Sequence, residues 1–169
     1  MTAQKILFVV LDGISDRPCP ELGGLTPLTA AKKPVLDRLA REGICGIMDT
    51  IAAGVRPGSD TAHLALLGYD PYHYYTGRGP LECEGTGIHM DPGMIGFRCN
   101  YATISRDGII TDRRAGRIHD TTGLSAAIQE GVDLSHVGVE FIFRSGAGHR
   151  ASLALKGEGL GHCISSNDP

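Results

Sequence analysis

The first hydrophobic feature of the chain is an uninterrupted apolar run from Ile6 to Leu11, which ends at Asp12 and Gly13. Continuous rather than alternating hydrophobicity is typical of a strand that is buried on both faces of a parallel sheet. The carboxyl ends of such strands open onto the ligand crevice of an α/β fold. Asp12 therefore occupies a position suited to a metal ligand or an acid/base group. The alternative is that its side chain only caps the Asp-Gly turn.

The next segment carries apolar residues at the spacing of a helix. Pro34 in the first turn and Gly43 just beyond the end are typical of helix boundaries. One apolar stripe runs along this helix, made of Val35, Leu36, Leu39 and Ala40. Residues 43–51 then resemble a second strand. A strand, a helix and a strand in this order predict a right-handed βαβ unit, with the stripe packed on a sheet.

A short helix is predicted at residues 62–67, and the loop before it delivers Ser59, Asp60 and Thr61 to its start. A side chain at that position lies beside free backbone N–H groups and the positive end of the helix dipole. Both favour an alkoxide or a bound phosphate. The plain alternative is that Ser59 only caps the helix.

From Leu81 onward the pattern changes to short apolar runs separated by glycine-rich and arginine-rich turns. A helix is predicted at residues 121–130, capped by Thr121 or Thr122. The second half is therefore expected to be a separate α+β lobe, with the boundary near residues 72–90. The strand-like runs are residues 95–104, 108–110, 137–143 and 150–155.

Composition and charge argue against some classes of protein. The formal charge is −3 and the sequence pI is about 6.1, which argues against a protein that coats nucleic acid or a membrane surface. No apolar run is long enough for a membrane span. The five scattered cysteines indicate free thiols in a reducing cytoplasm. Arginine outnumbers lysine 12 to 4, which suits a site for small anions but equally fits a codon bias towards arginine.

Several segments together closely resemble the archaeal-type cofactor-independent phosphoglycerate mutases, which belong to the alkaline phosphatase superfamily. The resemblance covers essentially the whole chain, and its most specific part is the Ser-Asp-Thr-Ala-His block at residues 59–63. The segments that carry it are residues 11–13, 57–71, 76–82, 97–103 and 112–117.

The resemblance implies an α/β fold in two parts. Residues 1–80 would be the N-terminal part of an alkaline-phosphatase-like parallel-sheet domain that binds metal. Residues 81–169 would be part of an inserted α+β lobe that binds substrate. The implied reaction is the interconversion of 2-phosphoglycerate and 3-phosphoglycerate in glycolysis and gluconeogenesis, by phosphoryl transfer at a two-metal site.

The implied chemistry centres on two residues. Asp12 would be a metal ligand, and Ser59 would be both metal ligand and nucleophile, carrying the phosphoryl group as a phosphoserine. Two divalent ions of manganese, zinc, magnesium or cobalt are implied, and no 2,3-bisphosphoglycerate. Water must be kept out, or the phosphoserine is hydrolysed. The implied partner is a small phosphoglycerate in the cytoplasm, with no nucleic acid and no membrane.

A second group of candidates would bind the substrate phosphate and carboxylate. Three arginines within five residues would repel one another unless anions pair with them, although salt bridges to Asp112 and Asp120 could serve instead. Arg98 lies within an apolar run and needs a partner or a ligand. The substrate-binding candidates are Arg98, Arg113, Arg114, Arg117 and Arg150.

Three further residues are candidates for supporting roles. His63 follows Ser59 by four residues and so shares its helix face; it could act as a general acid or support the site, or merely pack. Asp60 could support the metal site or cap the helix. His149 precedes Arg150 at the start of a predicted strand.

The sequence departs from the family pattern in length. A two-metal site needs more protein ligands than Asp12 and Ser59, so we expect an N-terminal portion that binds metal weakly and turns over little by itself. Its half sheet would expose an unpaired edge. The alternatives are a metal-dependent phosphatase or phosphotransferase of the same superfamily, or a non-catalytic truncated fragment.

Overall fold

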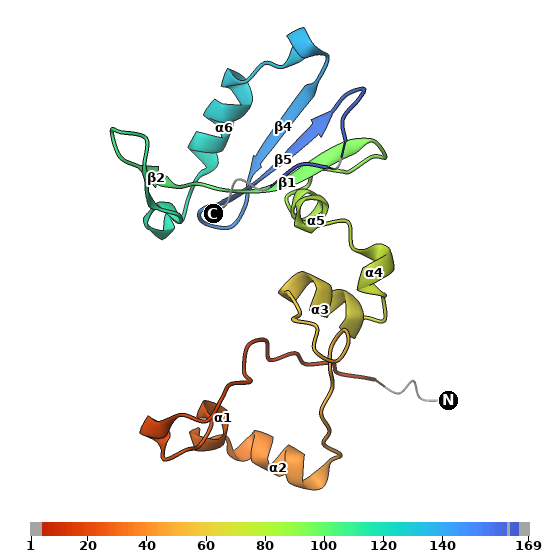
Figure 1. Ribbon diagram of the computed structural model, residues 1–169, viewed down its shortest axis with the longest axis vertical. Coiled ribbons are helices and arrows are strands. Elements are labelled where there is room, and N and C mark those ends of the chain that lie inside the picture. The colour runs from red at the N-terminus through yellow and green to blue at the C-terminus, as the bar shows by residue number, and fades with distance from the viewer. Residues whose placement is uncertain (1–4, 162, 166–169) are drawn as a thin grey trace. The chain divides into compact units, whose positions relative to one another are not determined.

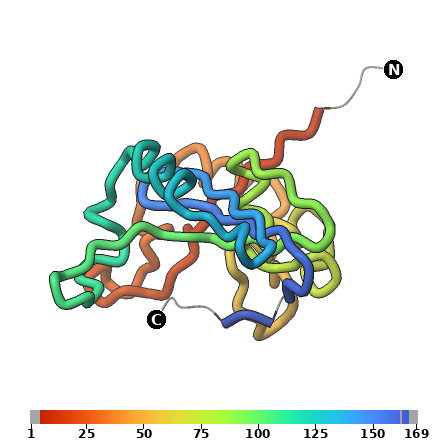
Figure 2. The backbone as a smooth tube through the Cα atoms, turned by 90° about the horizontal axis from the view of Figure 1, so that it is seen from above, coloured from red at the N-terminus to blue at the C-terminus, as the bar shows by residue number. Residues whose placement is uncertain are grey.

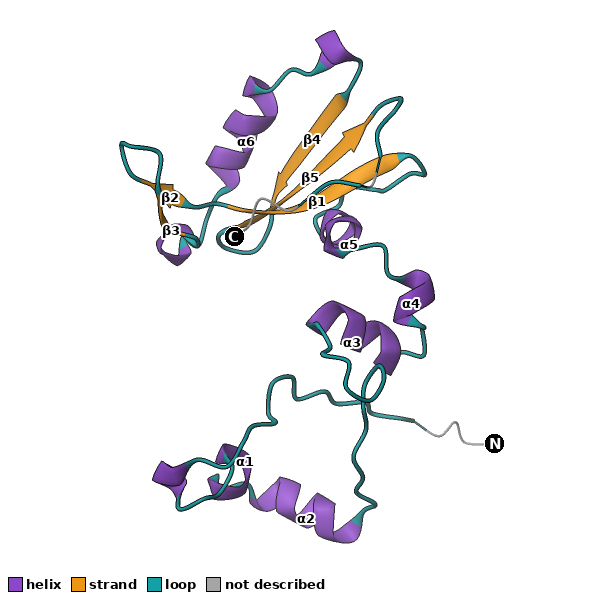
Figure 3. Ribbon diagram, in the orientation of Figure 1, coloured by secondary structure: helices purple, strands orange, loops and turns teal. Residues whose placement is uncertain are grey.

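The computed structural model describes residues 5–161 and 163–165, which fall into two compact units, Met1–His73 and Tyr74–Pro169. Figure 1 follows the chain through its helices and strands, and Figure 2 traces the same backbone from above. Helices and long loops make up the described part of the first unit, whereas the second contains a sheet with helices beside it (Figure 3). No helix in the described ranges is long and apolar enough to cross a membrane.

Proline is the first residue of every helix of the first unit except α3. Thr26 caps α1 by accepting a hydrogen bond from the backbone N–H of Thr29 at 3.1 Å. Helix α2 begins at Pro34 and ends where the N–H of Gly43 donates to the carbonyl of Leu39, so the sequence prediction for this helix is confirmed. The elements are η1 (Pro20–Leu22), α1 (Pro27–Ala30), α2 (Pro34–Glu42), α3 (Ser59–Leu66) and α4 (Pro71–Tyr74), the last at the junction of the units.

The two strands predicted for this unit are absent from the described residues. Residues 5–11 and 43–51 have no ladder partner, and the only β-type pairing described here is an isolated bridge between Cys19 and Leu25. A strand exists only through hydrogen bonds to a neighbour, so these apolar runs stay exposed; Ile6 is 94% and Ile44 105% exposed. The expected parallel sheet is therefore not formed among residues 5–161 and 163–165, and the apolar stripe of α2 also remains largely exposed.

The second unit is built on an antiparallel sheet with the strand order β1-β5-β4. Gly96 of β1 and Ile142 of β4 both pair with Ala154 of the central strand. A two-stranded hairpin, β2-β3, stands apart. The strands are β1 (Met94–Asn100), β2 (Thr103–Ile104), β3 (Ile110–Asp112), β4 (Glu140–Ser145) and β5 (Arg150–Lys156), and the helices are α5 (Arg78–Gly85), η2 (Ala115–Arg117), α6 (Thr122–Gly131) and η3 (Ser135–Val137).

These elements confirm the strand-like runs and the helix predicted from the sequence, with shifted ends. The long run at residues 95–104 divides into β1 and β2. Helix α5 is an element that the sequence pattern does not predict. The compact units divide between His73 and Tyr74, within the range of residues 72–90 given above for the boundary, and α5 packs on β1 and β5.

Two glycines let α5 lie directly against the sheet. A Cβ atom added to Gly79 would lie 1.8 Å from the carbonyl oxygen of Gly96, and one added to Gly96 would lie 2.8 Å from the backbone nitrogen of Pro80. Neither contact could be relieved by moving a side chain, because the opposing atoms are backbone. Beside them Cys83, fully buried, donates its thiol hydrogen to the carbonyl of Leu153 at 3.4 Å.

A pair of hydroxyl groups and a side-chain amide make further contacts that connect the helices α5 and α6 to the sheet. Thr86 bonds to Ser152, which is fully buried, and so joins the end of α5 to the central strand. On the outer edge of β4, the Gln129 amide donates to the carbonyl of Phe141 at 3.1 Å and accepts from the N–H of Phe143 at 2.6 Å. Gln129 therefore satisfies two edge groups as a neighbouring strand would.

We predict that Gly79→Ala lowers the free energy of unfolding of the second unit by about 2–4 kcal/mol, because a methyl group there overlaps the backbone of β1. Urea denaturation followed by far-ultraviolet circular dichroism measures this. The matched control is Gly123→Ala in α6, where an added Cβ meets nothing within 4 Å; its helix propensity should leave stability unchanged or raise it by up to about 1 kcal/mol. Equal effects of the two substitutions would contradict the close-contact explanation.

Candidate functional site

The two residues singled out most strongly by the sequence touch each other. The hydroxyl of Ser59 donates a hydrogen bond to Oδ2 of Asp12 over 3.3 Å, although the residues are 47 positions apart. Both side chains are exposed. The contact places a hydroxyl and a carboxylate, the two kinds of oxygen ligand that hard divalent cations accept, side by side.

The local sequence explains why the Ser59 hydroxyl is available for this contact. Gly58, not Ser59, is the N-cap of α3, and Ser59 is the first helical residue. The Thr61 hydroxyl accepts from the N–H of Gly58 at 3.0 Å and lies 3.2 Å from the carbonyl of the same residue. The interpretation of Ser59 as a simple N-cap is therefore wrong, because Gly58 is the N-cap and the Thr61 side chain bonds to its backbone.

His63 is fixed by the backbone of Ser59. Its Nδ1 lies 2.5 Å from the Ser59 carbonyl oxygen. A carbonyl oxygen can only accept, so Nδ1 carries the hydrogen and, in the neutral ring, Nε2 presents its lone pair. The imidazole is exposed. This arrangement supports the first turn of α3 and leaves Nε2 able to take a proton or a ligand.

Metal ligation by the described residues is incomplete. Residues 5–161 and 163–165 contain no group of three or more His, Cys, Asp or Glu side chains that could hold a metal ion. Asp12 and Ser59 fit such an ion chemically but are only two ligand side chains. Asp60, the neighbour of Ser59, is half-buried and engaged in an interaction of its own.

The arginine candidates differ in what they contact within the second unit. Arg98 on β1 places its Nε 3.1 Å from a carboxylate oxygen of Glu82 on α5, so the partner that a half-buried arginine requires is supplied by the protein. Arg150 is the exposed first residue of β5. Arg113, Arg114 and Arg117 are exposed around η2.

Arg114 and Arg117 form no ion pair within the described ranges, so the alternative of salt bridges to Asp112 and Asp120 is not seen for these two, although the charge of Arg114 helps the backbone hydrogen bonds to lower the pKa of Asp112. Asp112 accepts hydrogen bonds from the backbone of its own turn instead. Asp120 accepts one from the N–H of Thr122 at 2.9 Å.

The fold brings the arginine-rich turn beside the start of β5. The buried Thr121 donates its hydroxyl hydrogen to the carbonyl of Gly148 at 3.2 Å. A Cβ added at Gly148 would lie 3.2 Å from the carbonyl oxygen of Ile118. His149 is close enough to Asp112 to help lower the pKa of that carboxyl. Candidates about 35 residues apart in sequence therefore share one region.

Backbone N–H groups hold the pKa of three exposed carboxyls below the ordinary value of 3.8. Each carboxylate accepts a hydrogen bond, at 2.8–2.9 Å, from the N–H two residues further along. Such bonds favour the charged form. The three residues are Asp112, Asp120 and Asp133.

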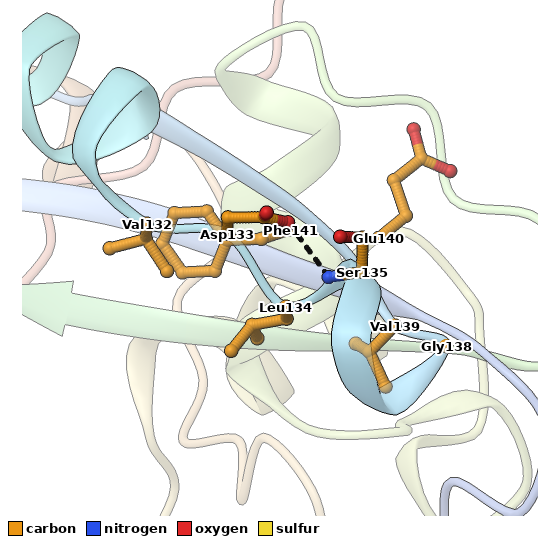
Figure 4. Close-up of a pocket in the computed structure, with 8 residues that line it drawn as sticks. All are labelled: Val132, Asp133, Leu134, Ser135, Gly138, Val139, Glu140 and Phe141. Atoms are coloured by element: carbon orange, nitrogen blue, oxygen red, sulfur yellow. Dashed lines mark hydrogen bonds between the residues drawn. The ribbon is translucent and has the colours of Figure 1, made fainter.

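A pocket between the end of α6 and the start of β4 contains none of the candidate residues. In Figure 4 the N–H of Ser135 points to Asp133 across it, and Glu140 extends from its rim. Its remaining lining residues are Val132, Leu134, Gly138, Val139 and Phe141. We do not assign it to the site.

Comparison with known sequences gives one consistent family. The profile described as 2,3-bisphosphoglycerate-independent phosphoglycerate mutase matches residues 40–169. A protein of that name from Methanoculleus marisnigri is 72% identical over 169 residues, which are all of this chain and 41% of the relative. A mutase from Archaeoglobus fulgidus is 54% identical over 97% of this chain and 40% of its own length. The chain spans about 40% of the length of these relatives.

Solved structures agree with the sequence comparison. The cofactor-independent phosphoglycerate mutase from Thermoplasma acidophilum is 47% identical and covers 90% of this chain and 39% of its own, with a TM-score of 0.50. A protein from Pyrococcus horikoshii is 34% identical and covers 85% of this chain and 35% of its own, with a TM-score of 0.68.

The lowered carboxyl pKa values predict how stability depends on pH. In the folded state these carboxyls bind fewer protons than in the unfolded state. Their contribution to the free energy of unfolding is therefore complete above the ordinary carboxyl pKa, and it is lost as the pH falls through the pKa of the folded state. The urea midpoint of the second unit should therefore rise between about pH 3 and pH 5. Asp133→Asn should flatten this rise, whereas Asp107→Asn should not, since the Asp107 carboxylate accepts no hydrogen bond from the described chain. Identical pH profiles for the two variants would contradict the assignment.

Proposed function

The chain belongs to the 2,3-bisphosphoglycerate-independent phosphoglycerate mutase family, and we propose that its reaction is the interconversion of 2-phosphoglycerate and 3-phosphoglycerate. Because the chain spans about 40% of its relatives' length, the activity is proposed for a protein of the length those relatives have. The relatives' name means that no bisphosphoglycerate takes part. We infer a cytoplasmic setting from the free thiols.

The contact between Ser59 and Asp12 is the observation that carries this proposal. The Ser59 oxygen attacks the phosphorus atom of 3-phosphoglycerate, and the bond from phosphorus to the C3 oxygen breaks, which leaves glycerate and a phosphoserine. The C2 hydroxyl of the retained glycerate then attacks the same phosphorus and releases Ser59. Asp12 orients the serine hydroxyl by accepting its hydrogen bond. No atom is gained or lost in the complete cycle.

The start of α3 favours the charge that this reaction develops. The first-turn N–H groups of a helix lack partners within the helix, and its dipole attracts negative charge. A phosphoryl group on Ser59 would lie at that end of α3. We assign His63 a supporting role, since its Nδ1 bond to the Ser59 carbonyl fixes the first turn and leaves Nε2 available for proton transfer.

Asp12 and Ser59 are also the residues that would hold divalent metal. Bound cations would stabilise negative charge on the serine oxygen and on the phosphoryl group. Two ions need further protein ligands beyond these two side chains, so the proposal includes ligands outside the described residues. Asp60 is a candidate for supporting that ligand shell.

Substrate binding falls to the second unit in this proposal. We assign the substrate's phosphate and carboxylate to Arg113, Arg114, Arg117 and Arg150, since planar guanidinium groups bind both in a bidentate manner. The His149 side chain adds a titratable donor at the same region. Arg98, which Glu82 already pairs, contributes to substrate binding only if that ion pair is shared. Residues 1–80 would thus belong to a phosphatase-like metal domain and residues 81–169 to a substrate lobe.

One observation favours a second candidate function. Ser59 is exposed in its unit, and a water molecule that reaches the phosphoserine would hydrolyse it. A phosphatase or phosphotransferase of the same superfamily would use the same two residues. Product analysis separates the candidates, because a mutase converts 3-phosphoglycerate into 2-phosphoglycerate whereas a phosphatase gives glycerate and free phosphate.

Ser59→Ala should lower kcat for 2-phosphoglycerate formation by at least about a thousandfold, since the covalent route is lost. Activity is followed by coupling the product to enolase, and acid-quenched turnover samples are digested to locate the phosphoserine by mass spectrometry. Ser15→Ala is the matched control, because this exposed serine of the same unit forms no hydrogen bond in the described chain. A phosphoryl adduct on another side chain would refute the assignment.

A further inference from the structure

The turn that follows β3 has an unusual backbone. Ala115, Gly116 and Arg117 are three consecutive residues with positive φ, at 46°, 64° and 57°. Only the middle one is glycine. Residues with a Cβ atom are disfavoured in this left-handed conformation, so other contacts must hold the segment, which we call the arginine turn (Asp112–Arg117).

The carboxylate of Asp112 supplies that constraint. Its Oδ1 accepts from the N–H of Arg114 at 2.8 Å, and its Oδ2 accepts from the N–H of Gly116 at 2.6 Å. Both oxygens are therefore committed to the backbone of the turn. These bonds, with the charges of Arg114 and His149, lower the pKa of Asp112, so the clamp is charged at neutral pH.

The two hydrogen bonds of the clamp come from backbone N–H groups and not from guanidinium groups. Arg114 and Arg117 are exposed and form no ion pair with a described residue. Asp112 accepts its two hydrogen bonds from backbone N–H groups, and Asp120 accepts one from the backbone N–H of Thr122. Clustered guanidinium groups repel one another, so a bound anion would stabilise this arrangement.

Other contacts anchor the arginine turn to the sheet. Its exit at Ile118 lies against Gly148, and Thr121 bonds to the Gly148 carbonyl. The exit of the turn is therefore held beside the start of β5, and His149 is near enough to Asp112 to contribute to its lowered pKa. These contacts at one end and the Asp112 clamp at the other hold the backbone that carries Arg114 and Arg117.

We propose that Asp112 is a positioning residue, which holds the arginine turn so that Arg114 and Arg117 present their guanidinium groups to a phosphate or carboxylate of the substrate. The identity of this substrate rests on the proposed function, whereas the binding of an anion by the arginine turn is independent of it. Asp112 itself does not touch the substrate, because both its oxygens face the turn backbone.

The test measures anion binding and catalysis separately in the full-length protein. Phenylglyoxal modifies exposed arginines, and mass spectrometry quantifies modification of Arg114 and Arg117 with increasing inorganic phosphate. Phosphate should protect both in the wild type. Asp112→Asn puts an amide N–H against a backbone N–H, so the phosphate needed for protection should rise by about tenfold or more. With 3-phosphoglycerate, KM should rise by a similar factor while kcat changes less.

Two further variants test whether phosphate protection depends on the backbone conformation of the arginine turn. Asp133→Asn removes a carboxylate with the same kind of turn hydrogen bond but no arginines beside it, and it should leave phosphate protection at the wild-type level. Adding Ala115→Gly to Asp112→Asn should regain protection, because glycine adopts a positive φ without a clamp. Circular dichroism checks that each variant is folded.

Unchanged protection in Asp112→Asn, or no protection in the wild type, would overturn this proposal. Failure of the double variant to regain protection would do so as well. A wild-type protein that binds phosphate at the arginine turn but forms no 2-phosphoglycerate would refute the proposed mutase function alone. The two failures are therefore distinguishable.

Discussion

The hydrogen bond from Ser59 to Asp12 joins the end of the first apolar run to the start of α3, and the proposed chemistry depends on it. It forms because Gly58 and Thr61 cap the helix between them, which frees the serine hydroxyl. His63 adds a second constraint by bonding to the Ser59 carbonyl. A nucleophile at a helix start is thus oriented by one remote carboxylate and one residue of its own helix.

Backbone N–H groups organise the charged residues of the second unit in a comparable way. Three aspartates each accept a hydrogen bond from the N–H two residues on. Only Asp112 accepts a second such bond, from Gly116, and only it precedes three consecutive left-handed residues among the described ones. One such bond is enough to cap a turn, whereas two bonds from the same carboxylate can hold a turn whose backbone is strained. The arginines of that turn are then carried on a fixed backbone.

The packing of α5 on the sheet of the second unit depends on small residues. Gly79 and Gly96 permit backbone contact between α5 and β1, and the buried Ser152 and Ala154 leave room for the helix on the central strand. The first unit has no comparable packing in its described part. Its most apolar segments, including Ile6 and Ile44, stay exposed because a strand needs hydrogen-bonded neighbours. The positions of Ser59 and His63 are therefore fixed locally, by α3 and its caps, whereas Asp12 reaches Ser59 through a contact distant in sequence.

The sequence by itself determined helices α2 and α6 and the strands of the second unit, because turn residues and short-range periodicity are local properties. Asp12 and Ser59 were each candidates from their places after an apolar run and at a helix start, and the family resemblance then implied that they act in one site. Only the tertiary structure decided that residues 5–11 form no ladder, that Glu82 partners Arg98, and that the Asp112 carboxylate binds backbone rather than guanidinium groups. These outcomes depend on which groups meet after the chain folds, and hydrogen-bond partners distant in sequence leave no periodic signal along it.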